Sequence, residues 1–189
     1  QALVVPMMGK SQVELAYGLL AVPRLAATYD AAWVMNVILG QYALGGRLGD
    51  RIRERDGMAY HVSSTLDAGV VEGPLVIRAG VGPADVERAI GAIEAEIDAF
   101  VEQGPTSQEV DDAVRYLIGA LPRYLETNQA IAGFLQMAEF FELGLDYHQR
   151  LAGHLRAVTR EDVHRAARAV LVPARAAVVA AGPYDGPLA

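Results

Sequence analysis

The sequence predicts an α+β fold, in which helices pack on one face of a mainly antiparallel sheet. The first observation behind this prediction is a set of short segments in which apolar and polar residues alternate, as in half-buried strands. The second is a set of longer segments in which apolar residues recur every three or four positions. The third is their order: a strand, helices, two strands, several helices and a last strand.

The first and last strands have different signatures. From Gln12 to Leu20 apolar residues alternate with polar or small ones, which predicts a half-buried strand, and Pro23 ends it. Ala174 to Ala181 is a run of small and β-branched residues after Pro173 and is expected to form the last strand. No strand is expected before Gln12.

Two strands are expected in the middle of the chain, over Met58–Asp67 and Val70–Gly80, joined around Ala68-Gly69 as an antiparallel hairpin. The first has a clear period of two, which is typical of a sheet with one wetter face. Its two predicted faces consist of Tyr60, Val62, Ser64 and Leu66 on one side and His61, Ser63 and Thr65 on the other.

Two helices are expected between the first strand and this hairpin. Asp30–Leu44 has apolar side chains on one helical face, and the Gly45-Gly46 pair stops it. Arg47–Arg55 is expected to form a second, short helix, which Asp56-Gly57 closes.

The helices after the hairpin begin with a strongly amphipathic one, in which the apolar residues are Val86, Ile90, Ile93, Ile97 and Phe100. Gly104-Pro105 breaks the chain after it. Thr106 and Glu109 have the spacing of a capping box, in which each side chain satisfies a backbone N–H of the other residue. The helix that they open is expected to kink or end at Pro122.

Three more helices are expected further along, over Asn128–Leu143, over Tyr147–Leu155, and from Thr159 through Val170. Thr159 and Asp162 have the spacing of another cap, and Pro173 ends the last helix. Residues 1–189 are therefore expected to form a single domain.

Composition excludes several classes of protein. The chain has 189 residues, 52% of them hydrophobic and 21% charged, which is enough apolar material for a sizeable core. A net charge of −7 argues against a nucleic-acid partner, because such partners need an excess of Lys and Arg. No apolar run is long enough to span a membrane. Gln1–Lys10 lacks the pattern of a signal peptide, so a cytoplasmic location is expected, and a first residue other than Met suggests a trimmed piece.

Common catalytic signatures are missing from the sequence. It contains no Cys, so a Cys nucleophile and Cys metal ligands are excluded. None of the four histidines stands in H-x-x-E-H or its reverse, and no serine has the G-x-S-x-G context. The sequence therefore predicts no metal site in this chain; its histidines are His61, His148, His154 and His164.

One segment, residues 39–60, is unusual because it places four arginines in a short helix beside a strand. In the simpler interpretation, Arg51 or Arg53 pairs with a neighbouring carboxylate on an exposed helix. In the functional interpretation, one arginine and Tyr60 converge on a carbonyl or carboxylate group, where their donors stabilise developing negative charge.

In this segment and beyond it, the sequence resembles the insulinase-like zinc metallopeptidases, a family that includes pitrilysin and the mitochondrial processing peptidase subunits. The resemblance is to their second, non-metal-binding domain, and it extends from about Lys10 to Pro183. One departure is Gly46, where the family often has Ser. The similar pieces are Leu39-Gly40, Gly46–Leu48, Ile52–Glu54, Gly57–Tyr60, Thr106–Val110, Leu125-Glu126, Gly144–Tyr147, Val158–Val163 and Gly182-Pro183.

The resemblance implies a homologous metal-bearing partner, as a domain or a subunit, which supplies H-x-x-E-H and zinc, and a peptide substrate enclosed between the two halves. It also implies an Arg and a Tyr seven residues apart that face the partner's zinc site, and this spacing selects Arg53 and Tyr60. Tyr60 would donate to the scissile carbonyl oxygen and Arg53 would hold a neighbouring substrate carbonyl. The chain binds no cofactor of its own and is expected to be inactive alone.

Two other functions stay open from the sequence. Relatives of this domain also serve as non-catalytic scaffold subunits, and the Arg53–Tyr60 pair argues against that function without excluding it. The third possibility is an unrelated α+β interaction module.

Overall fold

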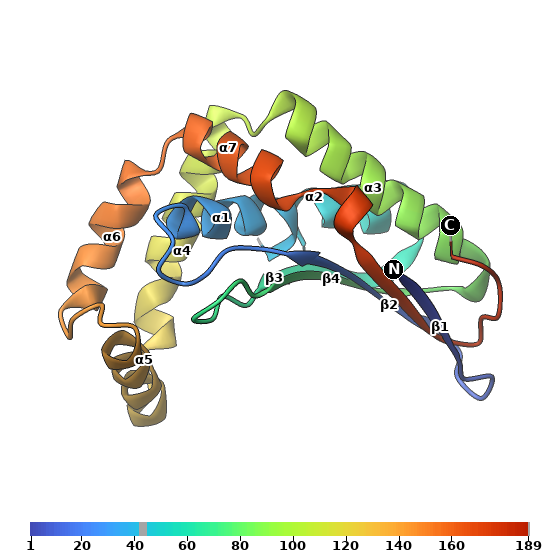
Figure 1. Ribbon diagram of the computed structural model, residues 1–189, viewed down its shortest axis with the longest axis horizontal. Coiled ribbons are helices and arrows are strands. Elements are labelled where there is room, and N and C mark those ends of the chain that lie inside the picture. Colours follow the sequence, from blue (N-terminus) through green and yellow to red (C-terminus); the bar gives the residue numbers. More distant parts are fainter. Residues whose placement is uncertain (42–44, 189) are drawn as a thin grey trace.

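A computed structural model describes residues 1–41 and 45–188 of the chain (Figure 1). The structure is a layer of helices above one five-stranded sheet, as the α+β prediction required. The strands are β1 (Ala2–Pro6), β2 (Val13–Leu20), β3 (Ala59–Leu66), β4 (Pro74–Val81) and β5 (Ala177–Gly182).

Seven α-helices and four shorter π- or 3₁₀-helical segments connect and flank these strands within the described ranges. The α-helices are α1 (Tyr29–Asn36), α2 (Gly46–Leu48), α3 (Val86–Gln103), α4 (Ser107–Tyr124), α5 (Asn128–Phe140), α6 (Tyr147–Ala157) and α7 (Arg160–Val170). The π-helices are η1 (Val37–Gln41) and η2 (Gly49–Arg55), and the 3₁₀-helices are η3 (Pro83–Asp85) and η4 (Pro173–Arg175). No helix in these ranges is long and apolar enough to cross a membrane.

The strand order is β1-β5-β2-β4-β3, and every neighbouring pair is antiparallel except β1 and β5, which are parallel. The expected hairpin is therefore confirmed as β3 and β4. Strand β1 was not expected from the sequence. Its five residues show no alternation of burial, and they form a strand because β5, more than 170 positions later, pairs with them from Ala2↔Val178 to Pro6↔Gly182.

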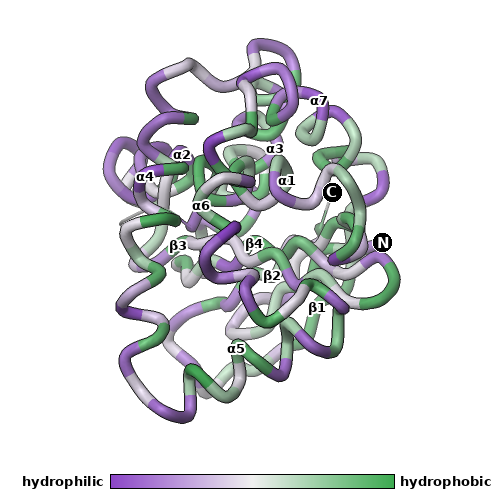
Figure 2. The backbone as a smooth tube through the Cα atoms, turned by 90° about the vertical axis from the view of Figure 1, so that its left-hand side faces the viewer, coloured by the Kyte–Doolittle hydropathy of each residue, from purple (hydrophilic) through white to green (hydrophobic). Residues whose placement is uncertain are grey.

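One face of the sheet is covered by the helices and the other is open (Figure 1). On β2 the buried residues Val13, Leu15, Tyr17 and Leu19 point toward the helices, and their polar or small neighbours lie on the open face. Figure 2 shows the hydrophobic stretches gathered where β2 and β4 run beneath the helices. Burial of this alternating apolar set holds the two layers together.

Local signals set most helix boundaries. Both capping boxes are present: the Thr106 hydroxyl accepts from Glu109 N–H while Glu109 accepts from Thr106 N–H, and Thr159 and Asp162 repeat the arrangement. Pro122 lies inside the last turn of α4, which ends at Tyr124, two residues beyond the expected stop.

The two early helices differ from the sequence prediction in their type. The expected helix Asp30–Leu44 consists of α1 followed by the π-helix η1, and its residues 42–44 lie outside the described residues. The expected helix Arg47–Arg55 consists of one α-helical turn followed by η2. Apolar spacing cannot separate these forms over one or two turns, because both place the same side chains on the inner face.

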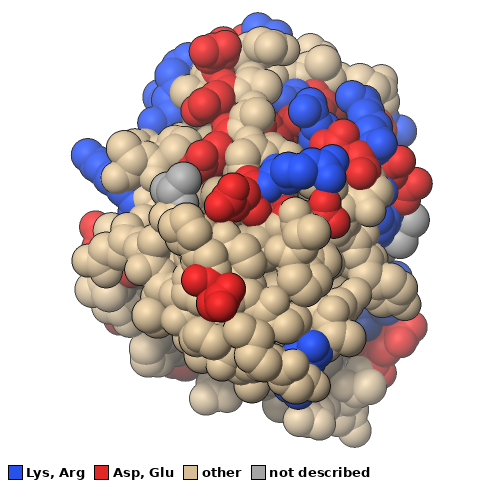
Figure 3. Space-filling model, turned by 90° about the vertical axis from the view of Figure 1, so that its right-hand side faces the viewer, with Lys and Arg blue, Asp and Glu red and all other residues tan. Residues whose placement is uncertain are grey.

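Charge is distributed unevenly over the surface. Figure 3 shows Lys, Arg, Asp and Glu gathered over the helical layer, whereas the surface below, formed by the sheet side of the molecule, is mostly uncharged. The side chains on the open sheet face explain this, since many are small or aliphatic: Leu3, Val5, Ala16, Gly18, Leu20, Val76 and Val179.

Candidate active-site segment

Arg53 lies in the π-helix η2, one residue after the fully buried Ile52, which anchors this segment to the core. The Arg53 Nε atom donates to Glu54 Oε1 at 2.9 Å, and the side chain is 22% exposed. Arg51 pairs with Asp56 at 3.0 Å. The local ion pairs of the simpler interpretation are therefore present, and they occupy only one nitrogen of each guanidinium group.

A tight turn joins this helix to β3. Gly57 has a left-handed φ of 61°, a conformation that glycine adopts without strain, and so Asp56-Gly57 ends the helix as expected. Met58 N–H then donates to the Ile52 carbonyl oxygen at 2.9 Å. This bond ties the start of β3 to the helical turn that carries Arg53.

Tyr60 does not lie on the face of β3 that its alternation predicted. The pairing of β3 with β4 runs Ala59↔Val81 and then His61↔Gly80, so Tyr60 is the extra residue of a β-bulge. The bulge leaves Tyr60 and His61 exposed one after the other, whereas Val62 and Ser64 are buried under the helices. Tyr60 is 81% exposed, and no side chain in residues 1–41 and 45–188 hydrogen-bonds its hydroxyl.

The strand that carries Tyr60 is at the edge of the sheet, since the order ends at β3. Backbone N–H and C=O groups on the outer side of an edge strand have no partner strand and can pair with an extended peptide. Tyr60 therefore stands at the start of an available strand edge, seven positions after Arg53.

Arg47, another arginine of residues 39–60, has a structural role. Its guanidinium group makes two hydrogen bonds to Glu109, at 2.6 and 2.8 Å, and one to the Gly104 carbonyl oxygen at 3.1 Å. Its Cζ atom lies over the Phe100 ring, 4.5 Å from the ring centroid. These contacts join α2 to the end of α3 and the start of α4, so Arg47 is not available to a substrate.

Gly46 stands where the resembled family often has Ser, and its backbone conformation explains the glycine. Its φ is +55°, and a Cβ atom there would overlap the Ile38 carbonyl oxygen. A serine Cβ at position 46 would make the same overlap, so this turn requires glycine.

Comparisons with known proteins assign this chain to a family. Residues 1–117 match the family model described as the peptidase M16 inactive domain. This chain belongs to the peptidase M16 inactive domain family. The insulinase-like resemblance seen in the sequence is thereby confirmed, and so is the α+β fold.

Two proteins and one crystal structure are similar to this M16 inactive domain. An uncharacterized zinc protease of Streptomyces coelicolor is 30% identical over 167 residues, covering 85% of this chain and 35% of the protease. The non-peptidase homolog YmxG of Helicobacter pylori is 25% identical over 135 residues, covering 69% of this chain and 30% of the homolog. The crystal structure of a peptidase M16 inactive domain from Pseudomonas fluorescens has a TM-score of 0.84 and 28% identity, covering 100% of this chain and 44% of that chain. The chain spans about a third of the length of the two sequence relatives.

The histidines of this M16 inactive domain lie apart from one another. His61 Nε2 lies 3.4 Å from Glu14, His154 Nδ1 lies 3.8 Å from Asp30, His164 Nε2 lies 2.7 Å from the Val101 carbonyl oxygen, and His148 packs edge-on against Phe134. No three His, Asp or Glu residues of the described chain are grouped as metal ligands. The described residues therefore do not form a set that fits a zinc ion.

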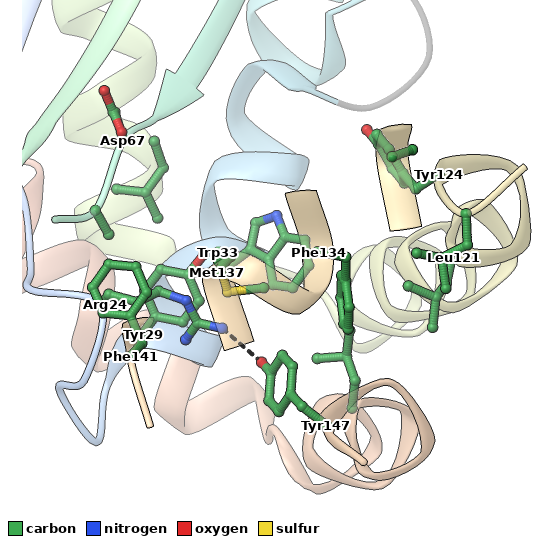
Figure 4. Close-up of a pocket in the computed structure, with 15 residues that line it drawn as sticks. Arg24, Tyr29, Trp33, Asp67, Leu121, Tyr124, Phe134, Met137, Phe141 and Tyr147 are labelled. Carbon is green, nitrogen blue, oxygen red and sulfur yellow. Dashed lines mark hydrogen bonds between the residues drawn. The ribbon is translucent and has the colours of Figure 1, made fainter. Parts of the chain in front are cut away.

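A cavity that no sequence pattern indicated lies at the far end of the sheet (Figure 4). Its walls come from α1, from the loop after β3, and from α4, α5 and α6. Among the described residues, Arg24 is the one basic side chain that lines it, and apart from Asp67 the other lining residues are aromatic or aliphatic. Arg24 stands in an irregular loop between β2 and α1, where no periodic pattern could single it out.

Proposed function

We propose that this M16 inactive domain is the substrate-binding and transition-state-assisting half of a zinc metalloendopeptidase. In this proposal residues 1–189 act as one domain, together with a homologous metal-bearing domain or subunit, on a peptide substrate. The observation that carries it is the exposed Tyr60 hydroxyl, which no described side chain hydrogen-bonds, at a bulge of an edge strand in a domain of a peptidase family.

The edge of β3 supports binding of an extended peptide. A substrate strand that pairs with the outer side of β3 would use main-chain hydrogen bonds, which do not depend on its side chains. Peptides of varied sequence could then be held in the same register. The bulge turns Tyr60 away from the core at the start of this edge, so its hydroxyl can reach the substrate backbone.

Arg53 and Tyr60 supply complementary donors. The Tyr60 O–H would donate to the carbonyl oxygen of the scissile bond, where negative charge develops as the tetrahedral intermediate forms. Glu54 occupies Arg53 Nε only, so the two terminal nitrogens of that guanidinium group can donate to a neighbouring substrate carbonyl. Both residues would then position the substrate while the partner half carries out hydrolysis.

The test is reconstitution of this chain with a metal-bearing homologous half, followed by peptidase assays of Tyr60→Phe and Arg53→Ala. Removing one donor to a developing oxyanion lowers kcat by about 10²–10³. We expect a loss of this size for Tyr60→Phe and a higher KM for Arg53→Ala. Near-normal turnover of both variants in an intact assembly would refute the proposed roles.

Matched controls separate these roles from general damage. Arg55→Ala removes an exposed arginine of the same helix at the wrong spacing, and Tyr184→Phe removes a tyrosine hydroxyl at the other end of the chain. Both should retain turnover. The isolated chain should contain no zinc and show no peptidase activity.

A second candidate function is a non-catalytic assembly subunit of the same fold. It is favoured by the 25% identity to a relative named as a non-peptidase homolog. Under this alternative the chain assembles with its partner, but the Tyr60→Phe and Arg53→Ala substitutions change nothing, and no activity appears when the partner is added.

A further inference from the structure

The cavity at the end of the sheet has the size and lining of a small-ligand site. Its volume is about 480 Å³, within the range of about 300–1,000 Å³ that is common for ligand pockets. Its apolar wall is formed by Trp33, Leu121, Phe134, Met137 and Phe141. Neither Arg53 nor Tyr60 lines it, so the cavity is separate from the segment proposed to assist catalysis.

One charged side chain, Arg24, enters this apolar space, and it is only 9% exposed. Its backbone N–H donates to the Gly69 carbonyl oxygen at 2.8 Å, which holds the loop in place. Its Nη2 donates to Tyr147 Oη at 2.8 Å, and its Cζ lies 4.0 Å from the centre of the Tyr29 ring. The guanidinium group is therefore held in one orientation at the cavity wall (Figure 4).

This buried cation forms no ion pair among residues 1–41 and 45–188, although Asp30 and Glu142 line a pocket on its other side. No carboxylate oxygen there lies within 4.0 Å of Arg24, although Asp67 also lines the cavity. Figure 4 shows the Asp67 carboxylate directed away from the guanidinium group. Asp30, on the other side of Arg24, is the carboxylate nearest His154. Burial raises the pKa of Tyr29 despite the nearby Arg24, so Tyr29 stays neutral and supplies no negative charge.

A buried charge without a partner is unfavourable, and a bound anion would relieve this. Arginine presents paired N–H donors that match the geometry of a carboxylate. We propose that this cavity binds an apolar carboxylate, with its carboxylate on Arg24 and its aromatic or aliphatic group against Trp33 and Phe134. The C-terminal residue of a peptide and a free aryl-alkanoic acid share this chemistry.

The wall formed by α5 offers a route of entry. Ala138 is the one residue of this helix that is fully buried, although α5 supplies Ala130, Phe134 and Met137 to the cavity. A helix with so little buried surface can move at small energetic cost. Outward movement of α5 would admit a ligand without disturbing the sheet.

The experiment uses the single tryptophan of the chain, Trp33, as a built-in probe, because it lines the cavity. N-acetyl-phenylalanine, its amide and 4-phenylbutanoate are titrated while Trp33 fluorescence is recorded. We expect both acids to bind, and the charged form of the first to bind about tenfold or more tightly than its amide. Tighter binding of N-acetyl-phenylalanine than of 4-phenylbutanoate would identify a peptide C-terminus as the ligand class, and the reverse order a free acid.

Two variants test the role of the charge. Arg24→Gln should lower the affinity for the acid to that for the amide, whereas Arg175→Gln, outside the cavity, should change neither. If Arg24→Gln does not fold, Ala130→Phe, which fills the cavity and retains the charge, should abolish the Trp33 response. Equal affinities for acid and amide in the wild-type chain, or no response to any of the three compounds, would overturn the proposal.

Discussion

Arg47 and Glu109, 62 positions apart, are joined by two parallel hydrogen bonds, from Nε to Oε1 at 2.6 Å and from Nη2 to Oε2 at 2.8 Å. The same Glu109 carboxylate also accepts from the Thr106 backbone N–H. One carboxylate therefore completes the capping box of α4 and ties that helix to α2.

We expect Arg47→Met to lower the free energy of unfolding by about 1.5–3 kcal/mol, because it leaves a partly buried carboxylate without its charged partner. Urea denaturation measures this change. Arg51→Met breaks an exposed ion pair and should change stability by at most about 1 kcal/mol. Equal effects of the two substitutions would contradict the structural role of Arg47.

The same carboxylate predicts a dependence of stability on pH. Burial raises the pKa of Glu109, but the hydrogen bonds from Arg47 and Thr106 outweigh burial, so the pKa in the folded chain lies below its ordinary value. A carboxyl of this kind stabilises the fold above its unfolded pKa of about 4.3, and this contribution is lost as the pH falls toward the folded pKa. Between about pH 6 and pH 3, Glu109→Gln should lose less stability than the wild-type chain.

Glu96 provides a control, because its pKa is shifted in the opposite direction from that of Glu109. Burial raises its pKa despite the neighbouring Arg47, so the folded state holds its proton more tightly than the unfolded state does. Protonation of Glu96 therefore offsets part of the stability that the wild-type chain loses on acidification. The Glu96→Gln variant should lose stability more steeply as the pH falls. Chemical denaturation at several pH values measures this dependence. If the stability of the three proteins falls equally over this pH range, neither carboxyl contributes to the dependence of stability on pH.

Two glycines should respond in opposite directions to alanine. Gly46 has a left-handed φ, and a Cβ there would overlap the Ile38 carbonyl oxygen, so Gly46→Ala should cost about 2 kcal/mol or more. Gly91 lies within α3 with open space around it, so Gly91→Ala should stabilise the chain by about 0.5–1 kcal/mol. Thermal and chemical denaturation would measure both; destabilisation by Gly91→Ala would show that α3 is packed differently.

The ion pair between Arg53 and Glu54 predicts a kinetic effect that depends on the proposed function. Glu54 competes with substrate for the Arg53 guanidinium group, and its side chain is 60% exposed. An exposed pair contributes at most about 1 kcal/mol, so Glu54→Gln should lower KM by no more than about fivefold and leave kcat unchanged. A higher KM in the reconstituted peptidase would mean that Glu54 positions Arg53 for the substrate.

Much of the fold was predictable from nearby residues. The capping boxes at Thr106 and Thr159 defined helix starts correctly, because the groups that satisfy each other are three positions apart. Arg53 and Tyr60 were selected by the family resemblance, which implies an Arg and a Tyr seven positions apart. Their roles stay predictions, whereas the family to which they pointed is confirmed.

Other features depended on contacts that no local pattern contains. The period of two placed Tyr60 on the same face of β3 as Val62 and Ser64, and the structure separates it from them because pairing with β4 introduces a bulge at that residue. The cavity around Arg24 could not be predicted because its walls come from segments more than 100 positions apart.

The sequence by itself determined the α+β class, the paired strands β3 and β4, the capped helices and the peptidase family, because these depend on neighbours within a few residues and on their order along the chain. Only the tertiary structure decided that β1 exists, that Tyr60 is exposed, and that Arg24 is buried without an ion-pair partner among the described residues. Each of these depends on which distant segment lies beside the residue, and that is determined by the packing of the whole chain.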